Sequence, residues 1–83
     1  MQLEILTPAK NVFSGEVKLV KVPGSNGSFE IMKNHAAIIS SLNDGELKVI
    51  TASDEALRYH ISGGVVEVNN NHVIVLAESI VNN

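Results

Sequence analysis

Turn residues that recur at intervals of about eight to twelve residues, with short apolar segments between them, constrain the fold of this chain more than any other feature. The clearest turns are residues 23–27, 43–45 and 70–71, which are rich in Gly, Asn and Pro. Gly and Asn accept the positive φ that tight turns require, and Pro fixes its own φ. Between the turns, segments such as residues 3–7 and 46–50 alternate apolar and polar side chains, as half-buried strands do. The spacing predicts an all-β chain folded as a sandwich or a barrel.

The apolar pattern of residues 16–22 changes face midway. Val17 and Leu19 share one face of an extended strand, whereas Val20 and Val22 share the other. A β-bulge between Leu19 and Val20 would bring all four side chains to one side. A twisted strand that is covered on both faces is the alternative.

Helical signals are weak. The best candidate is residues 53–58, with Ser53 as an N-cap, but this segment is too short to be stable alone. We therefore expect a turn between two strands there, and little or no helix elsewhere. Gly63 and Gly64 mark a bend or a close approach of two backbones.

The chain has 83 residues and forms one domain, residues 1–83, with no internal linker or repeat. A domain of this size has a thin stability margin, and the chain has no cysteine with which to form a disulfide. Its histidines, His35, His60 and His72, show no ligand spacing, so we expect no metal and no cofactor. A partner subunit is the remaining source of stability, which favours a component of an assembly.

Charge and composition exclude several classes of partner. The net charge is −3, and the six basic residues are spread along the chain. Nothing therefore attracts the chain to nucleic acid. The longest apolar run is residues 73–77, far shorter than the roughly 20 residues of a membrane span, so we expect no membrane insertion. The N-terminus lacks the pattern of a signal peptide, and an intracellular location follows as the default.

No motif predicts catalysis, so we expect a chain that is not an enzyme. The glycine-rich residues 24–27 lead into a strand and not into a helix, unlike a phosphate-binding loop. His35 has neither a nucleophile nor an orienting carboxylate near it in the sequence. The carboxylates fall at turns and on polar strand faces. Glu78, at the end of an apolar strand, is the exception, and we expect it to be half-buried and paired with a lysine.

Several segments together resemble a known family. They are Phe13-Ser14-Gly15-Glu16-Val17, residues 22–31, Asn34-His35-Ala36, residues 61–68 and residues 73–78, together with Leu42 and Gly45. Their order and spacing resemble the N-terminal domain of the epsilon subunit of F-type ATP synthases, which is called delta in mitochondria. The resemblance runs from Leu3 to Glu78. It implies a flattened two-sheet β-sandwich of roughly eight to ten short strands.

The resemblance also implies a function and partners. It implies a non-catalytic subunit of the central stalk that links the gamma subunit to the c-ring and couples ion flow to ATP synthesis or hydrolysis. Its location would be peripheral, on the cytoplasmic face of the bacterial inner membrane, with contacts to the catalytic head. The c-ring contact candidates are Gly27, Ser28, Glu30 and His35. The gamma contact candidates are Gly63, Gly64, Val65 and Glu67.

Two departures from the family limit what can be carried over. Family members usually continue into a C-terminal helical hairpin, but residues 80–83 show no helical pattern, so we expect neither inhibition by a hairpin nor nucleotide binding there. Lys33 and Asn34 stand before His35, where glycine or proline is common in the family. The alternatives to a stalk subunit are a generic β-sandwich module that binds a protein or a ligand, and a small enzyme.

Overall fold

The computed structural model of the chain describes residues 1–82 and contains only strands among them. None of these residues belongs to a helix that is long and apolar enough to cross a membrane. The nine strands are β1 (Gln2–Leu6), β2 (Asn11–Val22), β3 (Phe29–Met32), β4 (Ile38–Leu42), β5 (Gly45–Thr51), β6 (Ala56–Ile61), β7 (Gly64–Asn69), β8 (His72–Ala77) and β9 (Ile80–Asn82).

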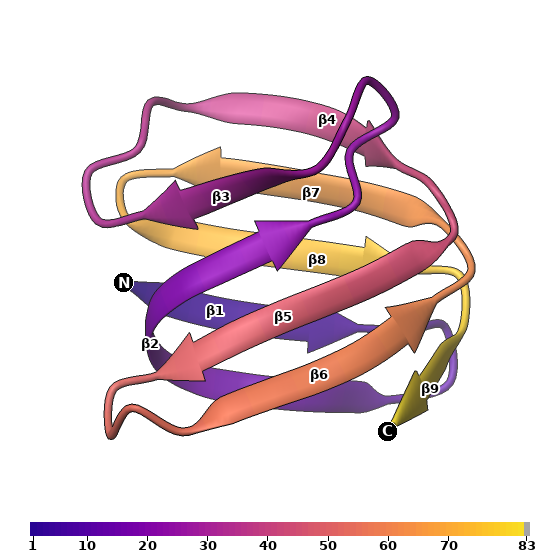
Figure 1. Cartoon of the computed structure of the whole chain (residues 1–83), viewed down its shortest axis with the longest axis horizontal. Coiled ribbons are helices and arrows are strands. Elements are labelled where there is room, and N and C mark those ends of the chain that lie inside the picture. Colours follow the sequence, from indigo (N-terminus) through magenta and orange to yellow (C-terminus); the bar gives the residue numbers. More distant parts are fainter. Residues whose placement is uncertain (83) are drawn as a thin grey trace.

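The strands form two layers that share β2 (Figure 1). The first sheet has the order β4-β7-β8-β1-β2, and the second has the order β3-β2-β5-β6-β9. The first part of β2 pairs with β1, and its second part pairs with β3 and β5. All neighbours are antiparallel except β1 and β8. The two-sheet sandwich predicted from the sequence is confirmed.

An aliphatic core fills the space between the sheets. The inward side chains alternate along each strand with outward ones, as the period of a strand requires. No polar or charged side chain is buried among the described residues, and Tyr59 is the one aromatic in the buried core. The fully buried side chains include Leu3, Ile5, Val20, Val22, Ile31, Leu47, Val49, Ile61, Val66, Val73 and Val75.

The β-bulge of β2 is present, but the predicted position was wrong. The register with β5 shifts between Val17 and Leu19, which makes Lys18 the extra residue. Both Val17 and Val20 consequently point into the core, three residues apart. Leu19 is half-buried and lies outside that core, so only three of the four apolar side chains share the inner face.

The turns follow the predicted chemistry. Asn70 and Asn71 have φ of 50° and 61°, and they join β7 to β8 in a two-residue turn. Residues 52–55 form the turn that was expected in place of a helix, with Asp54 at φ 67°. Two strand segments had not been predicted, namely β9 and the first part of β2, where Ser14 and Gly15 weaken the strand signal.

Candidate functional site

Three of the four c-ring contact candidates lie on the two loops that flank β3, and the fourth, Glu30, lies on β3 itself. Gly27 and Ser28 are exposed in the loop between β2 and β3, where Gly27 has φ 118° and its amide donates to the Gly24 carbonyl at 3.0 Å. Gly24 is equally constrained, because a Cβ there would lie 2.7 Å from the Gly27 carbonyl oxygen. A compact glycine turn therefore presents Ser28 to solvent.

His35 lies in the loop between β3 and β4 and is half-buried. Its backbone amide donates to the Met32 carbonyl at 3.1 Å, and its Nδ1 lies 2.8 Å from the Ala36 carbonyl oxygen. The imidazole is tilted against the ring of Phe29, with the centroids 6.5 Å apart. No nucleophile or carboxylate contacts the imidazole in the described part of the chain, so its neighbours are those of a packed loop residue.

The four c-ring candidates do not share one surface. Residues 26–29 and residues 38–40 line a common hollow of about 470 Å³, and this hollow includes Gly27 and Ser28. His35 joins this group through Phe29. Glu30 lies opposite Lys21 on the outward side of the second sheet, away from the inward-facing Phe29.

The gamma contact candidates divide into two kinds. Gly63 is buried and Gly64 half-buried, with φ of 132° and 154°. A Cβ on Gly64 would lie 2.1 Å from the Leu76 carbonyl oxygen, so the close backbone approach expected from the sequence is confirmed. Val65 and Glu67 are exposed on the outward side of β7. The glycines shape the corner, and the other two residues face outward.

An apolar patch covers the outward side of the first sheet, and we call it the apolar face. It consists of Leu6, Ile39, Val65, Ile74 and Leu76, which the strand register brings together. Ile39, Leu76 and Val65 are 74%, 51% and 38% exposed. A hollow of about 500 Å³ between Leu6, Val65 and Leu76 deepens the patch. Large exposed apolar patches mark interaction sites.

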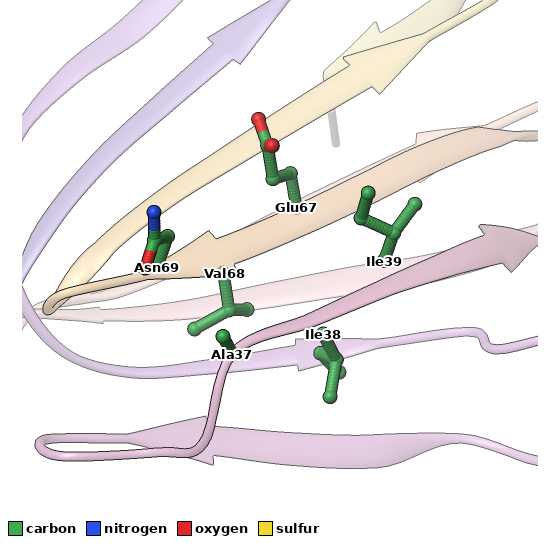
Figure 2. A pocket seen from close by; sticks show the side chains of 6 residues that line it. All are labelled: Ala37, Ile38, Ile39, Glu67, Val68 and Asn69. Atoms are coloured by element: carbon green, nitrogen blue, oxygen red, sulfur yellow. The ribbon is translucent and has the colours of Figure 1, made fainter.

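Figure 2 shows how β4 and β7 build one margin of the apolar face. Ile39, Glu67 and Asn69 project to one side of the two strands, whereas Ile38 and Val68 project to the other. Ile39 lies directly opposite Glu67 in the register. Among the residues of the apolar face, only Val65 had been predicted from the sequence to contact a partner. The missed signal was the presence of apolar residues at outward positions, as in the uninterrupted run of residues 73–77.

Charge is divided between the two sheets. Strands β1, β4, β7 and β8 contain no lysine or arginine, and Glu4 and Glu67 lie on their outward side. The second sheet instead carries a cross-strand row on its outward side, which we call the charged row: Glu30, Lys21, Lys48 and Arg58. In the register Glu67 lies between Ile39 and Ile74, and Glu4 lies opposite Ile74 on β1, so both glutamates are set among the apolar side chains. No lysine or arginine lies on these four strands.

Two of the three histidines each lie within hydrogen-bond distance of a carboxylate at the surface. His72 Nε2 lies 2.8 Å from Glu4 Oε2, and His60 Nε2 lies 2.7 Å from Asp44 Oδ1. Such pairs contribute little to stability. Burial, and then the carboxylate of Glu55, raise the pKa of the Tyr59 phenol. Within residues 1–82, no three His, Asp or Glu side chains lie close enough together to hold a metal ion.

The expectation for Glu78 was wrong. Its side chain is exposed, and no lysine forms an ion pair with it among the described residues. The backbone amide of Glu78 donates to the Gly63 carbonyl at 3.0 Å instead. The strand β8 ends at Ala77, so Glu78 lies in the connection to β9 and not on the sheet.

These features first define a class: the chain is a small two-sheet β-sandwich domain with an uncovered apolar patch on one outer side. The comparisons with known proteins define it further. Residues 1–83 match the family model described as the beta-sandwich domain of the ATP synthase delta/epsilon chain. The chain belongs to this family, and the resemblance drawn from its sequence is confirmed.

Curated relatives agree with this assignment. The ATP synthase epsilon chain of Protochlamydia amoebophila is 40% identical over 78 residues, which cover 94% of this chain and 53% of the relative. The ATP synthase epsilon chain of Chlorobium limicola is 39% identical over 79 residues, which cover 95% of this chain and 90% of the relative. The chain thus spans about half the length of the first relative and most of the second.

Solved structures share the fold. A chain of the mitochondrial ATP synthase of Euglena gracilis, in an OSCP/F1/c-ring assembly, superposes with a TM-score of 0.90 at 22% identity, over 96% of this chain and 51% of that one. A chain from the central stalk/c-ring of the Tetrahymena thermophila mitochondrial ATP synthase gives 0.82 at 20% identity, over 99% and 66%. At these identities the likeness concerns the fold.

Proposed function

We propose that this chain is a non-catalytic central-stalk subunit of an F-type ATP synthase, where it links the gamma subunit to the c-ring. In this position it helps to couple ion translocation to ATP synthesis or hydrolysis. Membership in the delta/epsilon family supports the proposal. The apolar face carries it further, because such a patch is costly to leave in water and is expected of a subunit isolated from its assembly.

The gamma subunit covers the apolar face in this proposal. Three of the five large hydrophobic side chains that are exposed in residues 1–82 lie there: Ile39, Val65 and Leu76. Glu4 and Glu67 lie on either side of Ile74 within this face. Electrostatic complementarity then requires a gamma surface with aliphatic side chains and with lysine or arginine placed opposite the two glutamates. Gly63 and Gly64 contribute by shaping the strands and not by direct contact.

The c-ring meets the loops beside β3 in this proposal. Gly27 and Ser28 present a short polar turn, and His35 holds the second loop against Phe29. Exposed backbone and hydroxyl groups of such loops suit the polar loops of a c-ring better than an apolar surface. Glu30 lies on the strand between the two loops and extends this contact toward the second sheet.

The location follows from the two contacts. The chain is a peripheral part of a membrane-bound complex, on the cytoplasmic face of the bacterial inner membrane, within reach of the catalytic head. It binds neither nucleic acid nor a cofactor, and its partner at the membrane is the c-ring and not lipid. The charged row has three basic side chains, but it contains no aromatic residue on which a nucleic-acid base could stack.

Calorimetric titration of the chain with the gamma subunit from the same organism tests the proposal, with ATP as a parallel titrant. We expect one-to-one binding to gamma and no heat with ATP. A folded chain that ignores gamma would refute the stalk function. It would favour the second candidate, a generic β-sandwich module, for which the apolar hollow at Leu6, Val65 and Leu76 would be the binding site.

A further inference from the structure

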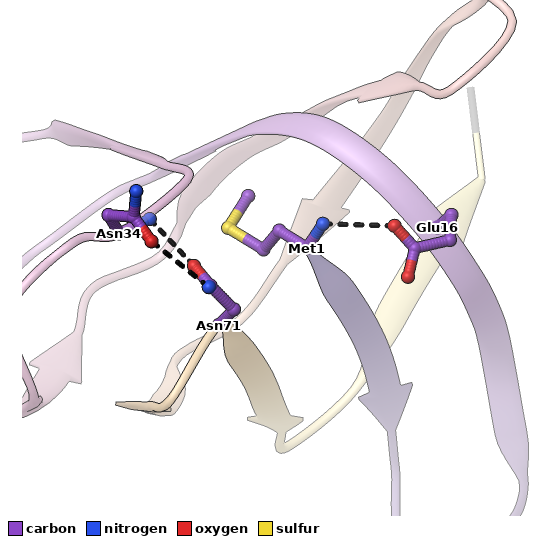
Figure 3. A network of polar contacts seen from close by, with 4 residues as sticks. All are labelled: Met1, Glu16, Asn34 and Asn71. Carbon is purple, nitrogen blue, oxygen red and sulfur yellow. Dashed lines mark hydrogen bonds and ion pairs between the residues drawn. The ribbon is translucent and has the colours of Figure 1, made fainter.

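Asn34 and Asn71 lie in two turns that are far apart in the sequence, and two hydrogen bonds join them at one end of the sandwich (Figure 3). The amide of Asn34 donates to Asn71 Oδ1 at 2.6 Å, and Asn71 Nδ2 donates to Asn34 Oδ1 at 3.1 Å. The two residues are 37 positions apart in the sequence. Asn34 directly precedes His35, and Asn71 lies at the tip of the β7–β8 hairpin. The pair of bonds therefore ties the His35 loop to the first sheet.

Asn71 is itself held on its other side. Its carbonyl oxygen accepts a hydrogen bond from the Gln2 amide at 2.9 Å, and the flanking residues Asn69 and His72 are paired in the register. Asn71 is thus fixed to both β1 and the hairpin. The other hydrogen bonds of the His35 loop, to Met32 and Ala36, stay within the loop and the end of β3. Of the hydrogen bonds described for residues 33–36, only those of Asn34 with Asn71 reach the first sheet.

Positions 34 and 71 both require a residue that accepts positive φ. Asparagine, unlike glycine, also has a side-chain amide that can bridge the two turns. Asn34 has φ 66° and Asn71 has φ 61°. Glycine would satisfy the backbone at either position, but it has no amide group to bridge the turns. Asn34 thus combines the left-handed backbone conformation with two hydrogen bonds to Asn71.

The geometry points to Asn71 as a positioning residue that fixes the His35 loop to the sheet carrying the apolar face. This inference rests on the proposed function. In that function the His35 loop meets the c-ring, while strands β7 and β8 present Val65, Glu67 and Leu76 to gamma. The bridge makes the two contact regions one rigid unit, as a subunit that transmits torque requires. Asn71 contacts neither partner in this account and acts through Asn34.

Asn71→Gly removes the bridge without harming the turn, since Asn-Gly is a preferred two-residue hairpin sequence. Asn70→Gly is the matched control, because it changes the same turn and leaves the bridge. Asn71→Asp is the rescue variant, because its carboxylate still accepts from the Asn34 amide. We expect hydrogen exchange of the Asn34 amide to become about fivefold to tenfold faster in Asn71→Gly alone. The downfield amide proton signal expected for a 2.6 Å bond should disappear in that variant and remain in the other two.

The functional readout compares two affinities, measured by titration of each variant with the purified gamma subunit and with the purified c-ring. We expect Asn71→Gly to lower c-ring affinity about tenfold, since the loop must then be ordered on binding. Gamma affinity should change by less than about twofold, because the two sites are distant. A general loss of stability would lower both affinities together and would move the thermal midpoint.

Three results would overturn the inference. They are unchanged exchange at Asn34 in Asn71→Gly, equal effects of Asn70→Gly and Asn71→Gly, or faster exchange with unchanged c-ring affinity. Failure of the proposed function has a different signature, because the unsubstituted chain would then bind neither gamma nor the c-ring. In that case a change of exchange confined to Asn71→Gly would still establish the bridge, but its role in positioning a c-ring contact would be refuted.

Discussion

The outward sides of the two sheets are built from the same strand geometry and differ in what they expose. The second sheet carries the charged row, in which four residues lie side by side on adjacent strands: Glu30, Lys21, Lys48 and Arg58. The first sheet carries the apolar face, with Glu4 and Glu67 on either side of Ile74 and no lysine or arginine on strands β1, β4, β7 and β8. A row of mixed charges is the ordinary solution for a sheet in water. The apolar face on the opposite side is the one that we propose the gamma subunit covers.

The backbone under the two sides differs as well. The apolar face depends on the close approach of β7 and β8 at Gly64, where a Cβ would lie 2.1 Å from the Leu76 carbonyl oxygen. The second sheet has its irregularity at the β2 bulge, where Lys18 points to solvent and pairs with Asp54 at 2.7 Å. A tight backbone contact tolerates no added atom, whereas an exposed bulge tolerates many side chains. The corner at Gly64 is therefore more demanding in sequence than the bulge at Lys18.

Gly64→Ala should have the largest effect, because it should force apart β7 and β8, the strands that carry much of the apolar face. We expect the free energy of unfolding in urea to fall by about 3 kcal/mol or more, because the new methyl group overlaps the Leu76 backbone. Gly27→Ala is the control, since Gly27 also has a positive φ but has open space around it, and it should cost about 1 kcal/mol. Equal losses in the two variants would show that backbone conformation, and not the close approach, fixes this corner.

Two neighbouring valines on β7 point to opposite sides of the first sheet, one into the core and one to the apolar face. Val66 is fully buried between the sheets, whereas Val65 faces outward. Val66→Ala should lower the free energy of unfolding by about 2 kcal/mol, and Val65→Ala by less than about 0.5 kcal/mol. Val65→Ala should instead weaken binding to gamma. The reverse order of stability losses in urea unfolding would mean that the two sides of β7 have been assigned wrongly.

The smallest effect concerns the inner side of the second sheet, where Tyr59 lies in the core. Burial raises the pKa of its phenol above the ordinary value of 10.0, so the unfolded chain loses this proton first. The stabilising contribution is complete below pH 10, and it is lost as the pH rises from there through the pKa of the folded state. Thermal unfolding should therefore show an alkaline loss of stability that is smaller in Tyr59→Phe. An identical alkaline profile in both would show that Tyr59 does not titrate in this way.

Local chemistry allowed much of the fold to be predicted from the sequence. The turn at Asn70 and Asn71 and the turn at residues 52–55 depend on residues that are neighbours in the chain. The left-handed backbone of Asn34, at φ 66°, likewise follows from a residue type that tolerates this conformation. Short-range preferences of this kind are visible without a partner strand.

The features that were missed depend on pairing between distant strands. The position of the bulge at Lys18 follows from the register of β2 with β5, which a single strand does not reveal. The apolar face requires β1, β4, β7 and β8 to lie side by side, and the bridge joins residues 37 positions apart. Glu78 was misassigned because the apolar run before it suggested a longer strand than β8. Pattern along the chain identifies strands, but register decides which side chains meet.

The most direct test of the account compares gamma binding by two variants that add the same charge to opposite sides of the sandwich. Leu76 on the apolar face and Met32 on the second sheet are 51% and 52% exposed, so Leu76→Lys and Met32→Lys place a lysine at nearly equal exposure. In calorimetric titration with the gamma subunit, we expect Leu76→Lys to lower the affinity at least about tenfold and Met32→Lys by less than about twofold. Equal losses, or a larger loss for Met32→Lys, would contradict the claim that the apolar face is the side that gamma covers.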